Sequence, residues 1–220
     1  MKYHVVVDLE MCNIPKSLRT KKYRWANETI QIGAVLLNED YEIVDDFNTY
    51  VSPKMGRIST FITNLTGIGV ENVKNAPDME QALIQFADWI PEGDVEMVSW
   101  SDSDQKQIRH ELIGKGIEND RIRNLLDCWD DCQITFSEKM DSDRRYSLNE
   151  ALIAAGIYQE GREHDGYFDA YNTALLYKKM KTEKDLVLSD IYSKAHEEKK
   201  EALTFSLGDL FKNLQLEMCS

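Results

Sequence analysis

The sequence predicts an α/β protein with a mixed five-stranded sheet and helices on both faces. Three observations lead to this prediction. Tyr3 to Val7 is a nearly continuous apolar run, which is typical of a central strand. Two further strand patterns follow, and turn residues join them as in an antiparallel hairpin. After them helical and strand patterns alternate, as in sheets with helices packed on both faces.

The first half of the chain contains the hairpin and two helical patterns. The hairpin strands are expected at 29–37 and 41–51, and Pro53 to Arg57 follows as a loop. Phe61 to Gly67 predicts a short helical turn that the glycine closes. Asp78 to Ile90 predicts an amphipathic helix, because its apolar residues recur on one face. The first strand is the most apolar and should therefore lie near the centre of the sheet.

The second half supplies the remaining strands and helices. Val95 to Ser101 predicts the fourth strand, and Asp102 to Lys115 a helix. We assign the fifth strand to Ile122–Cys128. Ser147 to Ala155 predicts a helix that begins with a capping box, in which Ser147 pairs with Glu150. A last helix is expected at Phe168–Met180.

The composition limits the possible functions. Apolar residues make up 42% of the 220 residues and charged residues 30%, as in a soluble globular protein. There are 39 acidic and 26 basic residues, so most of the surface should repel a polyanion, which argues against a general nucleic-acid coat. No apolar run approaches the roughly 20 residues that span a bilayer, and we expect no membrane partner.

The cysteines indicate a reducing environment. The four cysteines do not suggest a disulfide framework, and Cys128 and Cys132 lack the matching second pair of a zinc site. A strand pattern already begins at Tyr3, so we expect no secretory leader before it. These features predict reduced thiols and a cytoplasmic location.

Asp8 and Glu10 directly follow the first apolar run. On a strand, residues i and i+2 point to the same face, roughly 6.5 Å apart. Two such carboxylates repel each other unless a cation lies between them, and a divalent metal ion meets that need. A strand that ends in a solvated acidic turn would have the same pattern. The segment 13–27 that follows has five basic residues and no acid before Glu28, so it is either a phosphate-binding loop or a solvated one.

Two later stretches add acidic residues. Asp102 and Asp104 lie where the fourth strand meets the next helix. Asp102 could instead be the N-cap of that helix, and Asp104 could instead interact favourably with the helix dipole. His164 lies in a loop five residues before Asp169, which begins the last helix. A side chain that titrates near pH 7 beside a ligand for hard metals resembles a catalytic arrangement. The remaining histidines have no such neighbours in the sequence, and we interpret them as packing or surface residues.

Asp-x-Glu, then Asp, then His-x-x-x-x-Asp resembles the DEDD exonuclease superfamily in its histidine-bearing branch, the DnaQ-like 3′-to-5′ exonucleases with a ribonuclease H-like fold. Residues 28–35 (ETIQIGAV), 61–68 (FITNLTGI) and 147–157 (SLNEALIAAGI) resemble further segments of that family. The Asp8–Cys12 stretch and the stretch at Trp100 are most similar to the RNA-directed subgroup, which includes histone-mRNA and short-interfering-RNA exonucleases.

The resemblance implies a role for each site residue. Asp8, Glu10, Asp104 and Asp169 would bind two Mg²⁺ or Mn²⁺ ions, and His164 would be the general base. We choose Asp104 over Asp102 because the family's second-motif aspartate has an apolar residue four positions later, which Ile108 supplies here. Substrate-binding residues would be Met11, Leu65 and Thr66, although core packing explains the same residues equally well.

The predicted function is metal-dependent 3′-to-5′ hydrolysis of single-stranded nucleic acid, with RNA favoured and nucleoside 5′-monophosphates as products. A DNA exonuclease and a non-catalytic module that binds nucleic-acid ends are the alternatives. The domain should cover residues 1–182. Residues 183–220 should be a helical extension that packs on this domain or forms a homodimer contact, because Phe205 to Met218 carries apolar residues at helical spacing.

Overall fold

The computed structural model describes residues 2–186, 188–189 and 192. The strands are β1 (Lys2–Asn13), β2 (Asn27–Leu37), β3 (Ile43–Tyr50), β4 (Asp94–Ser99) and β5 (Trp129–Asp131). The α-helices are α1 (Thr60–Thr66), α2 (Val70–Val73), α3 (Met79–Trp89), α4 (Ser103–Lys115), α5 (Asp120–Leu125), α6 (Cys132–Lys139), α7 (Leu148–Ala155) and α8 (Gly166–Thr182). A short 3₁₀ turn, η1 (Lys16–Leu18), lies in the connection after β1. The predicted extension from Phe205 to Met218 lies outside the described residues.

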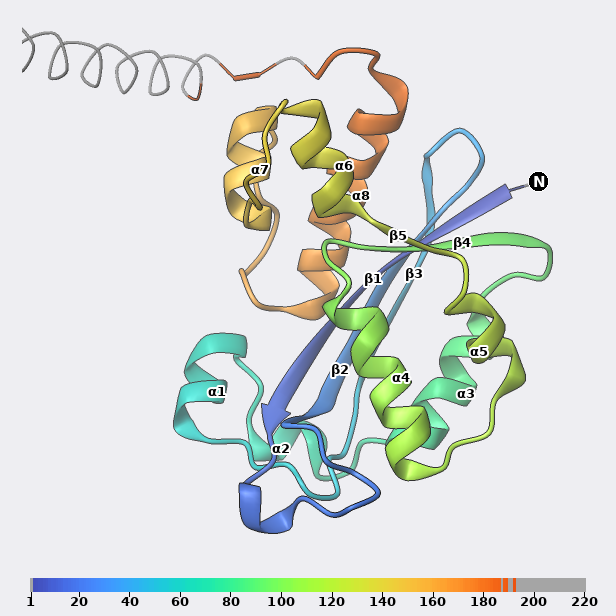
Figure 1. Cartoon of the computed structure of the whole chain (residues 1–220), viewed down its shortest axis with the longest axis vertical. Helices are drawn as coiled ribbons and strands as arrows, with labels where there is room; N and C mark the ends of the chain where they lie inside the picture. Colours follow the sequence, from blue (N-terminus) through green and yellow to red (C-terminus); the bar gives the residue numbers. More distant parts are fainter. Residues whose placement is uncertain (1, 187, 190–191, 193–220) are drawn as a thin grey trace, which may run out of the picture.

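The five strands form one mixed sheet in the order β3-β2-β1-β4-β5. β1 is the central strand, as its apolar run predicted (Figure 1). It pairs antiparallel with β2 on one side and parallel with β4 on the other. β2 and β3 form the predicted antiparallel hairpin. The mixed five-stranded sheet is therefore confirmed.

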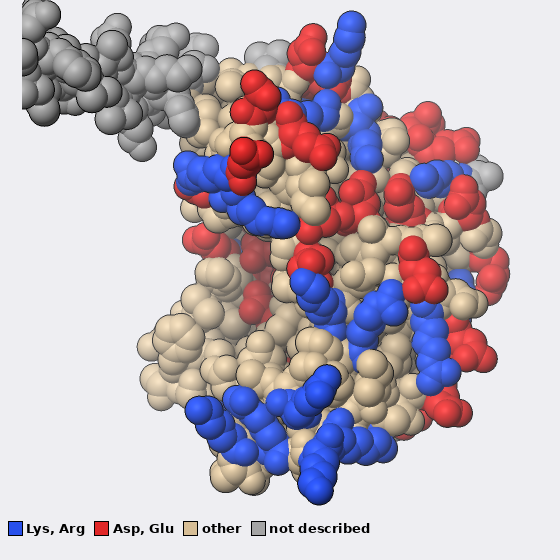
Figure 2. All heavy atoms as spheres, viewed as in Figure 1, with Lys and Arg blue, Asp and Glu red and all other residues tan. Residues whose placement is uncertain are grey.

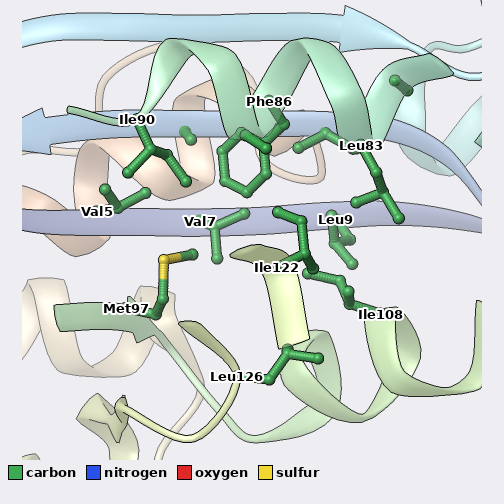
Figure 3. Close-up of a cluster of buried hydrophobic side chains, with 14 of the residues drawn as sticks. Val5, Val7, Leu9, Leu83, Phe86, Ile90, Met97, Ile108, Ile122 and Leu126 are labelled. Carbon is green, nitrogen blue, oxygen red and sulfur yellow. The ribbon is translucent and has the colours of Figure 1, made fainter. Parts of the chain in front are cut away.

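Helices cover both faces of the sheet. Successive side chains of β1 point to opposite faces, so the strand packs against a different set of helices on each side. Val5, Val7 and Leu9 belong to a core that α3, α4 and α5 cover. Figure 3 shows these three side chains between Phe86 of α3 and the helices below the strand. Val6 points the other way, into a second core under α6, α7 and α8. Each face of β1 is therefore buried, which explains why its sequence is a nearly continuous apolar run.

The helix ends follow the predicted capping signals. The Ser147 hydroxyl accepts a hydrogen bond from Glu150 N–H, and the Glu150 carboxylate accepts one from Ser147 N–H, so the capping box is confirmed. Asp78 caps α3 by accepting from Gln81 N–H. Gly67 closes α1 at φ +80°, a left-handed conformation that suits glycine.

The predicted fifth strand at Ile122–Cys128 is wrong. Asn119 caps a helix there, α5, and its side chain accepts from Ile122 N–H. Ile122 and Leu126 are four residues apart and bury together in the first core, which is helical rather than strand spacing. The fifth strand is the three-residue β5, which pairs with β4 between Met97 and Ser99.

Gly33→Ala is expected to destabilise the protein by about 3 kcal/mol. β2 passes so close to the start of α8 that a Cβ at Gly33 would lie 2.2 Å from the Gly166 carbonyl carbon and 2.3 Å from Tyr167 N. These are backbone atoms, so α8 itself would have to shift. Urea denaturation measures the effect. Gly69→Ala is the matched control, because its Cβ would meet only the Asn72 side chain at an ordinary 3.6 Å; a loss as large as that for Gly33 would contradict the explanation.

No helix among the described residues has both the length and the apolar character to cross a bilayer.

Candidate active site

The candidate site lies where β1 and β4 separate. Their parallel pairing runs from Lys2 and Asp94 to Val6 and Val98 and then ends, whereas β1 continues to Asn13. α4 begins in the space beside the free edge of β1. There Asp104 Oδ1 accepts a hydrogen bond from Leu9 N–H at 3.0 Å. This crevice at the carboxyl ends of parallel strands is where open α/β sheets place their sites.

Asp8 and Glu10 reach this crevice from β1, and Asp169 reaches it from the first turn of α8. The α8 start lies against the sheet: Gly166 N–H donates to Gln31 Oε1 at 3.0 Å, and a Cβ at Gly166 would lie 3.1 Å from the Asp8 carbonyl oxygen. Glu10 and Asp169 are each only 8% exposed. The glycine at the start of α8 thus allows three carboxylates from distant parts of the chain to come together.

His164 lies at the mouth of the same crevice. Ligand atoms of Glu10, His164 and Asp169 all lie within 4.8 Å of one another. His164 is exposed and has φ +61°, a left-handed conformation that is uncommon for a residue with a side chain. Its backbone N–H donates to Asp169 Oδ2 at 2.9 Å. Asp169 therefore orients the histidine backbone with one oxygen and leaves the other for the crevice.

Burial raises the pKa values of all four clustered carboxyls. Burial, followed by the charges of Asp169 and Asp104, raises the pKa of Glu10 to about 8. Burial raises the pKa of Asp104 to about 7, although hydrogen bonds from Leu9 N–H and the Ser103 side chain act to lower it. Burial raises the pKa of Asp169 to about 6, although the backbone hydrogen bond from His164 and the charge of its ring act to lower it. Burial and the neighbouring Asp104 also raise the pKa of Asp8 well above its ordinary value.

These residues fit a site for divalent metal ions. Carboxylates that are buried together and raise one another's pKa need either protons or a cation, and hard oxygen ligands suit Mg²⁺ and Mn²⁺. Glu10 and Asp169 have carboxylate oxygens close enough to share one ion, and a ring nitrogen of His164 lies within 4.8 Å of both. Asp8 and Asp104 bring further carboxylates to the same crevice.

The metal-free protein is expected to lose stability as the pH rises from about 5 to about 8. The folded pKa of Glu10, about 8, lies above its ordinary value of 4.5, so the folded state holds a proton that the unfolded state has released. This contribution is complete at low pH and is lost as the pH rises through that window. We expect a fall on the order of 2 kcal/mol in the free energy of unfolding, measured in urea with chelator.

Glu10→Gln is the control for that measurement, because it removes the titrating group and keeps the shape. Its unfolding free energy should vary less with pH than that of the wild type, and saturating Mg²⁺ should flatten the wild-type curve. An equally steep decline in the variant would assign the pH dependence to other groups.

The structure separates the two candidate aspartates at the start of α4. Asp104 is 4% exposed and belongs to the cluster. Asp102 makes no capping hydrogen bond and pairs with Lys106 at the surface.

Of the predicted substrate-binding residues, Met11 and Leu65 are half-buried. The Thr66 hydroxyl is occupied within the chain, because it donates to Ile62 O and accepts from Ile68 N–H.

Sequence reasoning missed several residues around the crevice. Asp165 caps α8 by accepting from Tyr167 N–H, and its charge adds to those that raise the pKa of Asp8 and Glu10. Gln31 bonds both to Gly166 and to the Asp165 carboxylate, and its polar side chain in a strand was the signal available. Trp100 and polar residues of α6 and α7 line a groove beside the cluster. The stretch at Trp100 and residues 147–157 resemble family segments, but nothing in the sequence indicated that they line one groove with Asp8 and Asp169.

The basic segment 13–27 lies against α4. Tyr23 anchors it, with its ring against Gly114 and its hydroxyl donating to Asn27 O at 2.8 Å. Trp25 stacks on His110 of α4 at 4.4 Å between ring centroids. Figure 2 shows Lys and Arg side chains gathered at this lower end of the molecule, and acidic side chains in the hollow above it, on the left side of the view. The segment itself does not line the groove that contains Asp8 and Asp169.

Comparison with known proteins identifies similar chains. The family model described as Exonuclease (RNase_T) matches residues 5–177. ERI1 exoribonuclease 2 of Xenopus laevis is 34% identical over 178 residues, which cover 70% of this chain and 25% of that protein. This chain therefore spans about a quarter of that relative, and the corresponding share is 32% for the Danio rerio protein of the same name.

Two solved structures are similar in fold. The nuclease domain of 3′hExo, described as a DEDDh family member bound to rAMP, superposes with a TM-score of 0.71 at 22% identity, covering 86% of this chain and 96% of that one. A structure of histone mRNA stem-loop recognition by 3′-exonuclease superposes with a TM-score of 0.69 at 20% identity, covering 84% of each chain. The ribonuclease H-like fold predicted from the sequence is confirmed.

Proposed function

The chain belongs to the RNase_T exonuclease family, and on that basis we propose that it is a metal-dependent 3′-to-5′ exonuclease that degrades single-stranded RNA to nucleoside 5′-monophosphates. The observation that carries this proposal is the single cluster of Asp8, Glu10, Asp104 and Asp169, with His164 at its mouth. All five side chains are of the types that phosphodiester hydrolysis requires.

Each residue has a distinct part in the proposed reaction. The four carboxylates would hold two Mg²⁺ or Mn²⁺ ions, which supply charge neutralisation at the phosphate and lower the pKa of a bound water. His164 is exposed, with a ring nitrogen close to Glu10 and Asp169, so it can accept the proton of the attacking water as general base. Asp104 is oriented by Leu9 N–H, and Asp169 in turn holds the His164 backbone. The chain thus fixes both the ligands and the base on rigid elements.

The resemblance to RNA-directed proteins supports RNA as the substrate. The Xenopus relative is named an exoribonuclease, and the 3′hExo domain was solved with rAMP. DNA is the alternative, because E. coli exonuclease I with a dT13 oligonucleotide shares the fold at a TM-score of 0.60. A non-catalytic end-binding module is disfavoured by the presence of every expected active-site residue.

A paired degradation assay tests the proposal. Single-stranded RNA and the DNA of the same sequence, each labelled at the 5′ end, are incubated with Mg²⁺, with Mn²⁺ and with chelator. We expect a ladder that shortens from the 3′ end, depends on metal and forms at least about 10-fold faster on RNA, since the site would contact the 2′-hydroxyl. Equal rates would assign the substrate to both nucleic acids. No cleavage by a folded protein that still binds 3′ ends would favour the binding module.

A further inference from the structure

The basic segment 13–27 carries cations that pair with no acid. It forms the connection from β1 to β2, which Figure 1 shows with η1 at the lower end of the molecule. Figure 2 shows Lys and Arg side chains over this end. Within the described part of the chain, no ion pair involves any of its five cations, Lys16, Arg19, Lys21, Lys22 and Arg24.

Cations elsewhere on the described surface commonly pair with a neighbouring acid. Examples from α2, α5 and α8 are Lys74 with Glu71, Arg123 with Asp120, and Lys178 with Glu42. Glu28 and Glu111, whose charges act on Tyr23 of the segment, are fully buried and share Lys115. The segment therefore presents a positive surface without exposed acidic partners, in a chain whose formal net charge is −13.

The backbone of the segment is held in place by the rest of the protein. Ile14 and Tyr23 are each only 1% exposed. Ile14 N–H donates to Ala26 O at 2.7 Å, which closes the loop at its base. The Arg24 guanidinium lies over the Trp25 ring, 5.6 Å from its centroid. A ligand that binds the cations therefore does not have to order the backbone that carries them, which lowers the cost of binding.

The segment begins close to the acidic cluster. Asn13, the last residue of β1, follows Glu10 by three positions, which is roughly 10 Å along a strand. A hollow of about 320 Å³ lies between the two regions, and its lining residues include Met11, Trp25, Ser103 and Lys106. The Ser103 hydroxyl also donates to Asp104 of the cluster at 3.3 Å. A nucleic-acid strand whose 3′ end lies at the cluster can therefore reach the basic segment within a few nucleotides.

We propose that the basic segment binds phosphates of the RNA strand upstream of its 3′ end, as a contact separate from the acidic cluster. The inference rests on the proposed exonuclease function. RNA is the partner that the observations favour, because this surface attracts a polyanion that most of the chain repels, and because it lies within reach of a strand held at the cluster. Contacts to phosphates carry no sequence information, so the segment strengthens binding of long RNA of any sequence.

The test neutralises three cations of the segment. Lys16, Lys21 and Arg24 make no side-chain hydrogen bond among the described residues, so the triple variant Lys16→Gln, Lys21→Gln, Arg24→Gln keeps the hydrogen bonds of the loop. Arg19 and Lys22 stay unchanged. Arg19 Nε donates to Ile14 O at 3.1 Å, and Lys22 Nζ would lie 2.8 Å from a Cβ at Gly116, the residue that ends α4.

The triple variant is compared with the wild type on two substrates. One is a single-stranded RNA of about 16 nucleotides, at the upper end of usual single-strand site sizes. The other is the dinucleotide UpU, which has only the scissile phosphate. On the long RNA at low salt, kcat/KM should fall about 10- to 100-fold. The slope of log kcat/KM against log salt concentration should also become shallower by about 2, since each lost phosphate contact removes about 0.7. Turnover of UpU should stay within about twofold.

The control variant Lys74→Gln, Arg123→Gln, Lys178→Gln removes the same number of positive charges from positions that are paired with acids. Such surface pairs contribute little, so both rates should stay within about twofold of the wild type. Equal losses in the two triple variants would overturn the inference, because net charge rather than the basic segment would then attract the RNA.

The remaining outcomes separate this inference from the function on which it rests. Long-RNA turnover that stays at the wild-type rate in the segment variant overturns the inference and assigns the segment to another polyanion or to solubility. Equal losses on RNA and UpU also overturn it, because the substitutions would then act through the cluster or the fold, which thermal unfolding checks. Failure of the wild type on both substrates refutes the proposed function and the inference together, whereas UpU hydrolysis by the wild type supports that function independently of the segment.

Discussion

Asp8→Asn is expected to lower the rate of RNA degradation by at least about 1,000-fold. Asp8 is central to the cluster, and four other carboxylates, those of Asp104, Asp169, Glu10 and Asp165, raise its pKa. Asparagine keeps the size of the side chain but removes the charge, so metal ions would bind weakly and in the wrong positions. The rate is measured at saturating Mg²⁺ and again across a Mg²⁺ titration.

The same substitution should not destabilise the metal-free protein. Burial and its acidic neighbours raise the pKa of Asp8 well above its ordinary value, so loss of the carboxylate removes repulsion from the folded state. We expect the unfolding free energy in chelator at pH 8 to stay the same or to rise. Loss of activity without loss of stability separates a functional residue from a structural one.

Asp102→Asn is the matched control, because it makes the same chemical change two residues from the cluster member Asp104. Asp102 pairs with Lys106 at the surface, and such pairs contribute little to stability. Its activity should stay within about twofold of the wild type. A large loss with Asp102→Asn and a small one with Asp104→Asn would reverse our assignment of the third ligand.

His164→Gly should lower kcat on RNA by about 100- to 10,000-fold, the range expected for a lost general base. Glycine suits this position, because the backbone has φ +61°. The variant should therefore fold with its loop in place, and its N–H can still donate to Asp169 as in the wild type. Substrate binding should change much less than kcat.

Added imidazole provides a sharp test of that role. His164 is exposed at the mouth of the crevice, so its removal leaves a site that small molecules can enter. We expect imidazole to restore part of the activity of His164→Gly and to leave Asp8→Asn inactive. Unchanged kcat in His164→Gly, with or without imidazole, would show that another group accepts the proton.

The acids of the cluster could be found from the sequence because each lies at a recognisable point of local structure. Asp8 and Glu10 follow an apolar strand at spacing two, and Asp169 lies in the first turn of a helix whose loop carries His164. Local patterns also predicted the Ser147 capping box and the central position of β1. The fifth strand was misplaced because Ile122 and Leu126 pack at helical spacing in a short segment that strand propensity also fits.

The groove beside the cluster could not be predicted in this way. Asn149 and Gln159 are ordinary polar residues of a helix and a loop, and only packing brings them to the wall that Trp100 and Leu152 form. The close approach of Gly33 to Gly166 is likewise a contact between residues more than a hundred positions apart.

By itself the sequence determined the order of most elements, the central strand and the types of residue that carry the chemistry. These depend on periodicity, capping and spacing within a few residues of one another. Tertiary structure alone decided how far β4 follows β1, how Asp104 packs into the crevice while Asp102 stays at the surface, and which side chains line the groove beside the cluster. The physical reason is that burial and mutual repulsion, which give these carboxyls their raised pKa values, arise only when distant segments pack together.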